Sequence, residues 1–216
     1  MHWMFLIFLS FISCSGYKFT KRTNPLEQYG IKKLAVPAFY NKSSLAHVSP
    51  EFTKEIITML RQFPGLEVQN FNSDEADAVL IGIIESSDKY KEVVTNEDYR
   101  VTSDVAPQSI SINSRKDFYI PAITNVNLNI RFVLIKHPDT KEIELLMSDL
   151  GKQLKANSKI LFNQVITVNG KFNREILDGE ARSVNATQNR GAMSRTITSM
   201  ALTAKNGFKE LILYAF

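Results

Sequence analysis

The chain has 216 residues, with 26 lysines and arginines against 22 aspartates and glutamates, three histidines and one cysteine. Its apolar content of 44% and charged content of 22% are those of an ordinary folded domain and exclude a disordered chain. A formal charge of +4 without a basic run interleaved with aromatics argues against nucleic acid. Scattered histidines and a single cysteine provide no metal-ligand spacing. We therefore expect no nucleic-acid partner, no metal and no cofactor.

Residues 1–13 form a nearly unbroken apolar run that ends directly before Cys14. A membrane-spanning helix needs roughly 20 apolar residues, so this shorter run is typical of an export signal peptide. Cleavage before Cys14 would make that cysteine the mature N-terminus, and this arrangement resembles the lipobox of bacterial lipoproteins, in which the cysteine is acylated. Ser15 follows where an aspartate would resemble an inner-membrane retention signal, which favours the outer membrane. The alternatives are an ordinary cleaved signal with a chance cysteine, or a buried N-terminal strand.

Residues 14–30 are interpreted as the lipidated N-terminus and a linker, and residues 31–216 as a single domain. Residues 31–36 are aliphatic and β-branched and stop at Pro37, which predicts a strand. Ser49-Pro50-Glu51 is a typical helix start, and apolar residues recur at helical spacing as far as Phe63, before Pro64-Gly65 ends the pattern.

Residues 78–84 are apolar on both faces, which predicts an inner strand, with Gly82 marking a bulge or close packing. Residues 89–94 extend that strand in our interpretation, and residues 96–117 form a long hairpin or loop. Apolar residues alternate with polar ones from Asn125 to Leu134, which predicts a strand with one buried and one polar face.

We expect a turn at 137–141 and a partner strand containing Ile143, Leu145 and Met147. A second hairpin is predicted from strands 160–168 and 171–176, joined at the favoured turn dipeptide Asn169-Gly170. The apolar residues from Met193 to Ile212 follow a helical period and predict a long closing helix. The expected fold is α+β, with two helices packed on one face of a mostly antiparallel sheet.

Motifs for catalysis are absent from the sequence. There is no Gly-x-Ser-x-Gly elbow, phosphate-binding loop, His-Glu-x-x-His motif or dinucleotide fingerprint. Asp74, Glu75 and Asp77 form a small acidic cluster, which we interpret as a solvated turn with a strand-initiating aspartate. We therefore expect a non-catalytic protein, and a periplasmic hydrolase or lipid-modifying enzyme is a remote alternative.

Several stretches together resemble the LptE family of lipopolysaccharide-assembly lipoproteins. They are Cys14 with Gly16-Tyr17 and Phe19, the strand 31–36 with residues 37–43, the helix 52–63, and residues 76–84. The resemblance is fairly specific from Cys14 to about Ile84 and architectural beyond it. The extra Ser15 and additional residues within 89–120 and 147–176 depart from the family pattern.

The resemblance implies a lipid-anchored outer-membrane protein whose body faces the periplasm and the lumen of an LptD-like β-barrel. Such a protein plugs the barrel, assists its assembly and takes part in delivering lipopolysaccharide to the outer leaflet. Cys14 would carry the lipid. The lysines that we place on or near exposed turns are candidates for contacting lipopolysaccharide phosphates: Lys136, Lys141, Lys152, Lys155 and Lys159. The alternative is another outer-membrane lipoprotein, of the curli-secretion or penicillin-binding-protein-activator type, acting through protein contacts.

Overall fold

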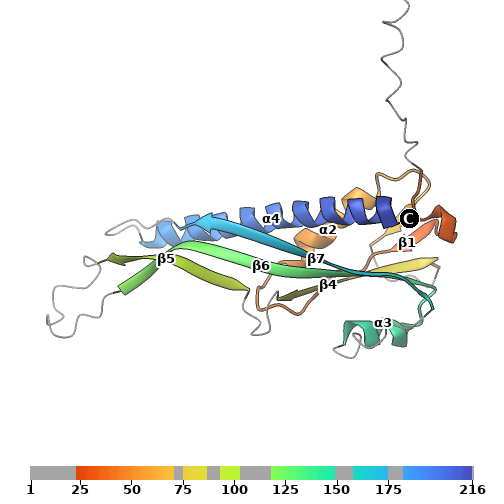
Figure 1. Cartoon of the computed structure of the whole chain (residues 1–216), viewed down its shortest axis with the longest axis horizontal. Coiled ribbons are helices and arrows are strands. Elements are labelled where there is room, and N and C mark those ends of the chain that lie inside the picture. Colours follow the sequence, from red (N-terminus) through yellow and green to blue (C-terminus); the bar gives the residue numbers. More distant parts are fainter. Residues whose placement is uncertain are drawn as a thin grey trace, which may run out of the picture.

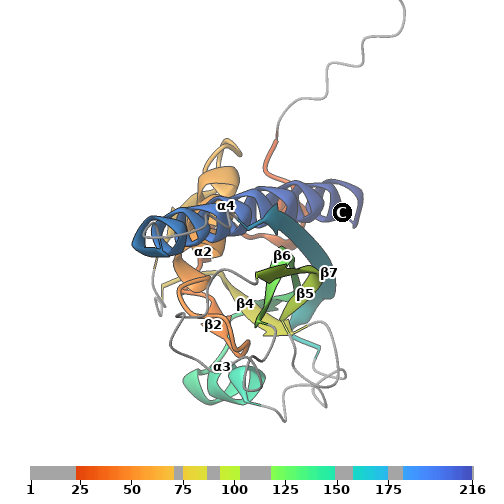
Figure 2. The ribbon, with the colours of Figure 1, turned by 90° about the vertical axis from the view of Figure 1, so that its left-hand side faces the viewer.

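The computed structural model describes residues 23–70, 75–86, 93–102, 118–148, 158–174 and 182–215. These residues form an elongated body in which a mixed seven-stranded sheet carries helices on both faces (Figures 1 and 2). The α+β prediction is confirmed. No helix of the described residues has the length and apolarity needed to span a membrane.

The sheet is organised around one long strand, β6 (Phe118–Lys136). Along one edge of β6, the first half of the strand pairs antiparallel with β5 (Val94–Thr102) and the second half with β4 (Ala78–Ser86). The other edge pairs antiparallel with β7 (Ile160–Asn173). The short strands β1 (Lys33–Ala35), β2 (Tyr40–Asn41) and β3 (Glu67–Gln69) add parallel pairs, β1 to β3 and β4, and β2 to β4. The sheet is therefore antiparallel around β6 and parallel beyond β4.

The helices α2 (Ser49–Leu60) and α4 (Arg182–Ala215) cover one face of the sheet, as predicted (Figure 1). Even-numbered residues of β4 and β6 point toward them, and most of these are buried. At the centre, the Phe132 ring stacks on the Phe208 ring at 4.3 Å between centroids, and Phe39 meets Phe132 edge-on at 5.8 Å. The aromatic contact joins the sheet to the closing helix.

A third helix, α3 (Thr140–Met147), lies against the opposite face (Figure 2), where a partner strand was expected. The prediction of a hairpin at 143–147 is wrong. Ile143 and Leu146 are buried against the odd-numbered residues of β4 and β6, whereas Leu145 is 37% exposed. The Glu142 carboxylate accepts a hydrogen bond from the backbone N–H of Asp139 at 2.9 Å, part of a capping box that starts the helix.

The expected hairpin at 160–176 is also wrong, because β7 continues through Asn169-Gly170 as one strand. Gly170 is needed for close packing rather than for a turn. A Cβ atom at this position would collide with Thr196 Cγ2 and would lie 2.6 Å from Met200 Sδ, both on α4. Gly82 has the same role, since a Cβ there would collide with the Phe39 ring. The expectation of close packing at Gly82 is confirmed.

Several boundaries differ from the sequence prediction: β6 begins at Phe118 rather than near Asn125, and Val94 begins β5 instead of extending β4. Ser49, at the predicted helix start, is the first residue of α2, and its hydroxyl donates to the Phe39 carbonyl oxygen. Within the expected linker, residues 27–29 form the single turn η1 (Glu27–Tyr29), and Leu26 before it is buried. The described chain is therefore part of the packed body before residue 31.

Candidate interaction face

The face of the sheet opposite α4 changes character along β6. Near α3 it is apolar, with Val79, Ile81, Val133 and Ile135 buried under the helix. Farther from α3, the same face is mostly polar, although Val165 of β7, opposite Arg131, is 50% exposed on it. None of the described helices covers this part of the face (Figure 1). We call this polar part the open face; its residues are Thr95 and Glu97 of β5, Glu85 of β4, Asn125, Asn127, Asn129 and Arg131 of β6, and Thr167, Asn169 and Lys171 of β7.

The register of the strands creates the open face. Asn125, Asn127 and Asn129 pair with Lys171, Asn169 and Thr167 across β6 and β7. Strand side chains alternate between faces, so each of these pairs points to the same side. The Thr167 hydroxyl donates to Asn129 Oδ1 at 2.7 Å. The result is a row of amide and hydroxyl groups, and amides can both donate and accept hydrogen bonds.

The open face is hollowed between β5 and β7. The hollow has a volume of about 460 Å³ and is lined by polar side chains and one glycine: Thr95, Glu97, Asn125, Asn127, Asn169, Gly170 and Lys171. Lys171 Nζ and Glu97 Oε2 are 3.8 Å apart across it, and both side chains are 57% exposed. An exposed pair of this kind contributes little to stability, and both groups can make new contacts with a partner at small cost.

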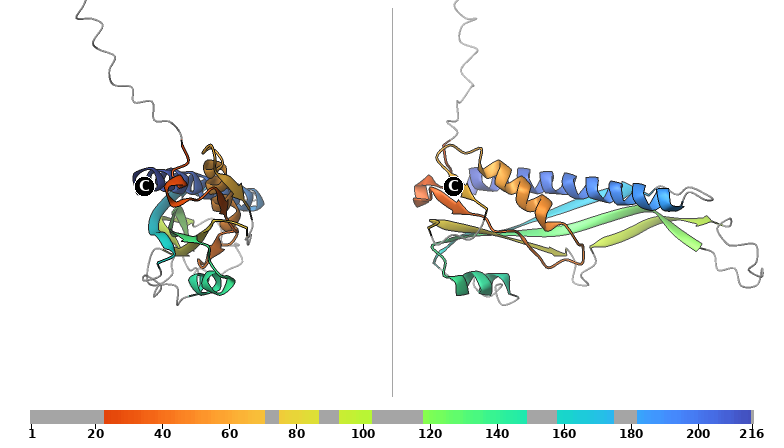
Figure 3. Two further views of the ribbon diagram at one scale, coloured as in Figure 1. Left: turned by 90° about the vertical axis from the view of Figure 1, so that its right-hand side faces the viewer. Right: turned by 180° about the vertical axis from the view of Figure 1, so that it is seen from behind.

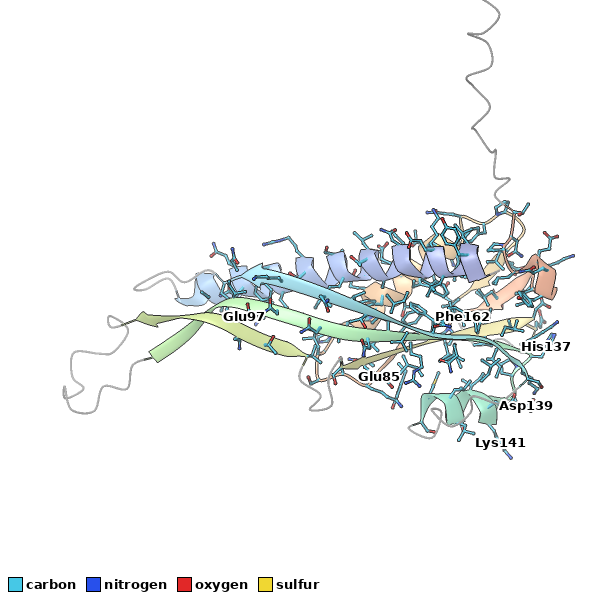
Figure 4. All side chains as sticks on the ribbon, viewed as in Figure 1. Glu85, Glu97, His137, Asp139, Lys141 and Phe162 are labelled. Carbon is cyan, nitrogen blue, oxygen red and sulfur yellow. The ribbon has the colours of Figure 1, made fainter. Side chains whose placement is uncertain are left out.

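A more buried ion pair lies between the hollow and α3. Arg131 Nη2 donates to Glu85 Oε2 at 3.2 Å, and the two side chains are 15% and 21% exposed. Figure 4 shows Glu97 toward one end of the molecule, Asp139 and Lys141 at the α3 end, and Glu85 between them. The Arg131–Glu85 pair therefore marks the point where the face turns from polar to apolar.

Three of the lysines predicted as phosphate contacts are described, and Lys136, Lys141 and Lys159 lie outside the open face. Lys136 ends β6, and its ammonium group donates to the Tyr29 carbonyl oxygen at 2.9 Å. Lys159 Nζ donates to Glu142 Oε2 at 2.9 Å, and this hydrogen bond raises the pKa of Lys159 above its ordinary value. Lys141 is exposed on α3. Cys14, Lys152 and Lys155 lie outside the described residues.

Of the acidic cluster, Asp77 has a clear structural role. Its Oδ2 atom accepts hydrogen bonds from the backbone N–H groups of Lys32 and Lys33, each at 2.8 Å. Those hydrogen bonds lower the pKa of the Asp77 carboxyl below its ordinary value. Asp77 thereby ties the start of β1 to the start of β4. Asp74 lies outside the described residues, and Glu75 lies 3.9 Å from Lys33 Nζ.

The open face suits a polar, hydrogen-bonding partner. Among the described residues, no three His, Cys, Asp or Glu side chains come together as a metal site. The sequence did contain a signal for this face, since polar residues alternate from Asn125 to Arg131. That alternation predicted a polar face, but it did not tell which part of the face the helices would leave uncovered.

No protein-family model matches the chain, and no curated protein sequence matches it. Solved structures do resemble its fold. The hypothetical protein CT253 from Chlamydia trachomatis has 9% identity and a TM-score of 0.37, covering 86% of this chain and 99% of its own. Lipoprotein GNA1162 from Neisseria meningitidis has 9% identity and a TM-score of 0.33, with 76% and 96% covered. Rare lipoprotein B from Shewanella oneidensis has 8% identity and a TM-score of 0.30, with 83% and 92% covered. At these values no family is assigned to the chain.

Proposed function

We propose that this chain is a non-catalytic, lipid-anchored protein of the outer membrane that resembles LptE. In this proposal Cys14 carries the lipid, and the body seats against an LptD-like β-barrel, assists its assembly and takes part in lipopolysaccharide delivery. The anchor is supported by the apolar run of residues 1–13 ending at the only cysteine. Acyl chains on one residue contribute about 0.8 kcal/mol per buried CH₂ group, and more than one chain is needed for stable attachment.

The observation that carries the barrel contact is the open face. The lumen of a large barrel is polar, so a body seated inside needs a polar surface that exchanges water for hydrogen bonds. The asparagine and threonine side chains of β6 and β7 supply donors and acceptors along three cross-strand residue pairs. Polar contacts of this kind fix orientation and specificity, while the lipid holds the protein at the membrane.

The proposal is tested by affinity isolation of the protein from detergent-solubilised outer membrane. We expect a large β-barrel protein to accompany it in stoichiometric amount, and depletion of this chain to leave that barrel misassembled. Isolation without any barrel protein would refute the plug. A Cys14→Ser variant should lose palmitate labelling and signal processing, and unchanged labelling would refute the anchor.

Matched variants separate the open face from the rest of the surface. Asn169→Arg places a bulky cation in the row on β7, and Thr203→Arg places the same side chain on the exposed side of α4. We expect Asn169→Arg to reduce the amount of co-isolated barrel several-fold and Thr203→Arg to leave it unchanged, with equal thermal stability of the two proteins. Equal loss for both variants would argue against the open face as the contact.

A further inference from the structure

We propose that one end of the body rests on the lipid surface to which the chain is anchored, with Leu213 and Tyr214 entering the headgroup region. We call it the anchor end; it is formed by η1 and the last turn of α4. This inference rests on the lipid anchor of the proposed function, and it adds an orientation of the body and a second, non-covalent membrane contact.

The first described residues of the chain are held at the anchor end by two hydrogen bonds. Lys136, the last residue of β6, donates its ammonium hydrogen bond to the carbonyl oxygen of Tyr29 in η1. The buried Asn24 side chain donates from Nδ2 to the Ile31 carbonyl oxygen at 2.7 Å. Figures 1 and 3 both place the C-terminal end of α4 beside η1. The last turn of α4 therefore lies next to the place from which the anchor segment leaves.

The anchor segment is short. Cys14 and Thr23 are nine residues apart in the sequence. A fully extended chain spans about 3.3–3.6 Å per residue, so this segment reaches roughly 30 Å at most, and a flexible one averages about 17 Å. By contrast, α4 has 34 residues and is about 51 Å long at 1.5 Å per residue. The lipid thus keeps the anchor end near the bilayer, while the start of α4 can extend far from it.

The anchor end presents apolar surface to its surroundings. Tyr214 is 87% exposed and Leu213 is 49% exposed, and they are adjacent in the last turn of α4. Tyrosine combines an apolar ring with a polar hydroxyl and is enriched where one end of a side chain is apolar and the other wet, as at a membrane interface. Lys209 and Glu210, one turn earlier, carry opposite charges. Because these two charges balance, we expect the anchor end to contact a zwitterionic lipid surface without needing anionic lipid.

The sequence allows a direct test by tryptophan fluorescence. The only tryptophan is Trp3, which lies in the signal segment and is lost on cleavage before Cys14. Tyr214→Trp therefore gives the mature lipoprotein a single tryptophan, at the anchor end, which is excited selectively at wavelengths that tyrosine does not absorb. Gln188→Trp is the matched control, exposed on the same helix and about 39 Å from residue 214 along its axis. Both lipidated proteins are reconstituted into phosphatidylcholine vesicles that contain phosphatidylcholine brominated near the headgroup.

We expect the bromine quencher to remove most of the emission of the tryptophan at position 214. We also expect this tryptophan to emit at shorter wavelength in vesicles than in buffer without vesicles or detergent. The tryptophan at position 188 should keep its emission. If both residues are quenched, the body lies flat, and if neither is quenched, the anchor end meets protein or water; either result overturns the inference. Palmitate labelling of the same samples tests the anchor separately. If the protein carries palmitate but the tryptophan at position 214 is not quenched, only the orientation is refuted. If the protein carries no palmitate, the anchor is refuted.

Discussion

Replacing Gly170 by alanine tests the contact that joins β7 to the closing helix. The added Cβ would collide with Thr196 Cγ2 and lie 2.6 Å from Met200 Sδ, whereas non-bonded carbon atoms prefer about 3.5–4.0 Å. Thr196 is 8% exposed and branched at Cβ, and Met200 is 1% exposed, so neither side chain has open space into which it can turn. Overpacking of this kind costs about 1–3 kcal/mol, and the lower entropy of the unfolded alanine chain returns about 0.4–1 kcal/mol. We expect a net loss of about 1–2 kcal/mol.

The assay is urea denaturation followed by far-ultraviolet circular dichroism, with the midpoint falling and the slope unchanged. Thr196→Ser removes the Cγ2 atom alone, so adding it to Gly170→Ala should recover part of the lost free energy of unfolding. The free energies of the two substitutions would then be non-additive, as expected for side chains in contact. A Gly170→Ala protein as stable as the parent, or a double variant that shows simple additivity, would refute the packing argument.

Three further substitutions test other parts of the fold. Gly191→Ala should stabilise the protein by about 0.5–1 kcal/mol in the same urea assay, because a Cβ there meets only Arg195 Nη1 at 3.5 Å and alanine favours the helix. Glu142→Ala should cost about 1 kcal/mol by removing both the capping contact of α3 and the hydrogen bond from Lys159, while Glu144→Ala, exposed on the same helix, should cost less. Asp77→Asn should cost about 1 kcal/mol at neutral pH and reduce the loss of stability below pH 3.8, measured by urea midpoints across acidic pH.

The sign of the pH effect follows from the direction of the Asp77 pKa. The folded protein lowers this pKa below 3.8, so the ionised carboxylate stabilises the fold at higher pH. That stabilisation is complete above the ordinary pKa and is lost as the pH falls through the lower, folded value. An asparagine does not titrate and can still accept a hydrogen bond. An unchanged acid profile in the Asp77→Asn protein would show that other carboxylates control acid unfolding.

Much of the fold could be predicted because its signals are local. The apolar run of β4, the alternation of β6 and the periodicities of α2 and α4 each lie within one stretch of sequence, and each predicted the correct element. The α3 segment failed because Ile143, Leu145 and Met147 fit a strand period as well as Ile143, Leu146 and Met147 fit a helix. The spacing of Asp139 and Glu142, three residues apart as in a capping box, favours the helix, and this spacing is visible in the sequence.

The β7 error has a different origin, because the reason for its glycine is not local. An Asn-Gly dipeptide between apolar stretches is typical of a tight hairpin turn, in which the glycine has a positive φ. In the described residues, however, the glycines with positive φ are Gly30 and Gly65, and Gly170 is in an ordinary strand conformation. Position 170 accommodates only glycine because α4, which comes later in the chain, packs directly over it. Nothing within residues 160–176 could reveal that contact.

The interaction face shows the same limit in another form. Lysines on turns are predicted as phosphate contacts because turns are usually exposed, and that role stays a prediction; exposure in a turn does not say which groups of the chain a lysine contacts. Lys136 holds η1 in place and Lys159 bonds to the cap of α3, so both have structural partners within the chain. The asparagines of β6 had an equally visible pattern, but whether a polar strand face remains open depends on how far α3 extends over it. We therefore expect substitutions on the open face to change partner binding, and substitutions at Lys136 or Lys159 to change stability first.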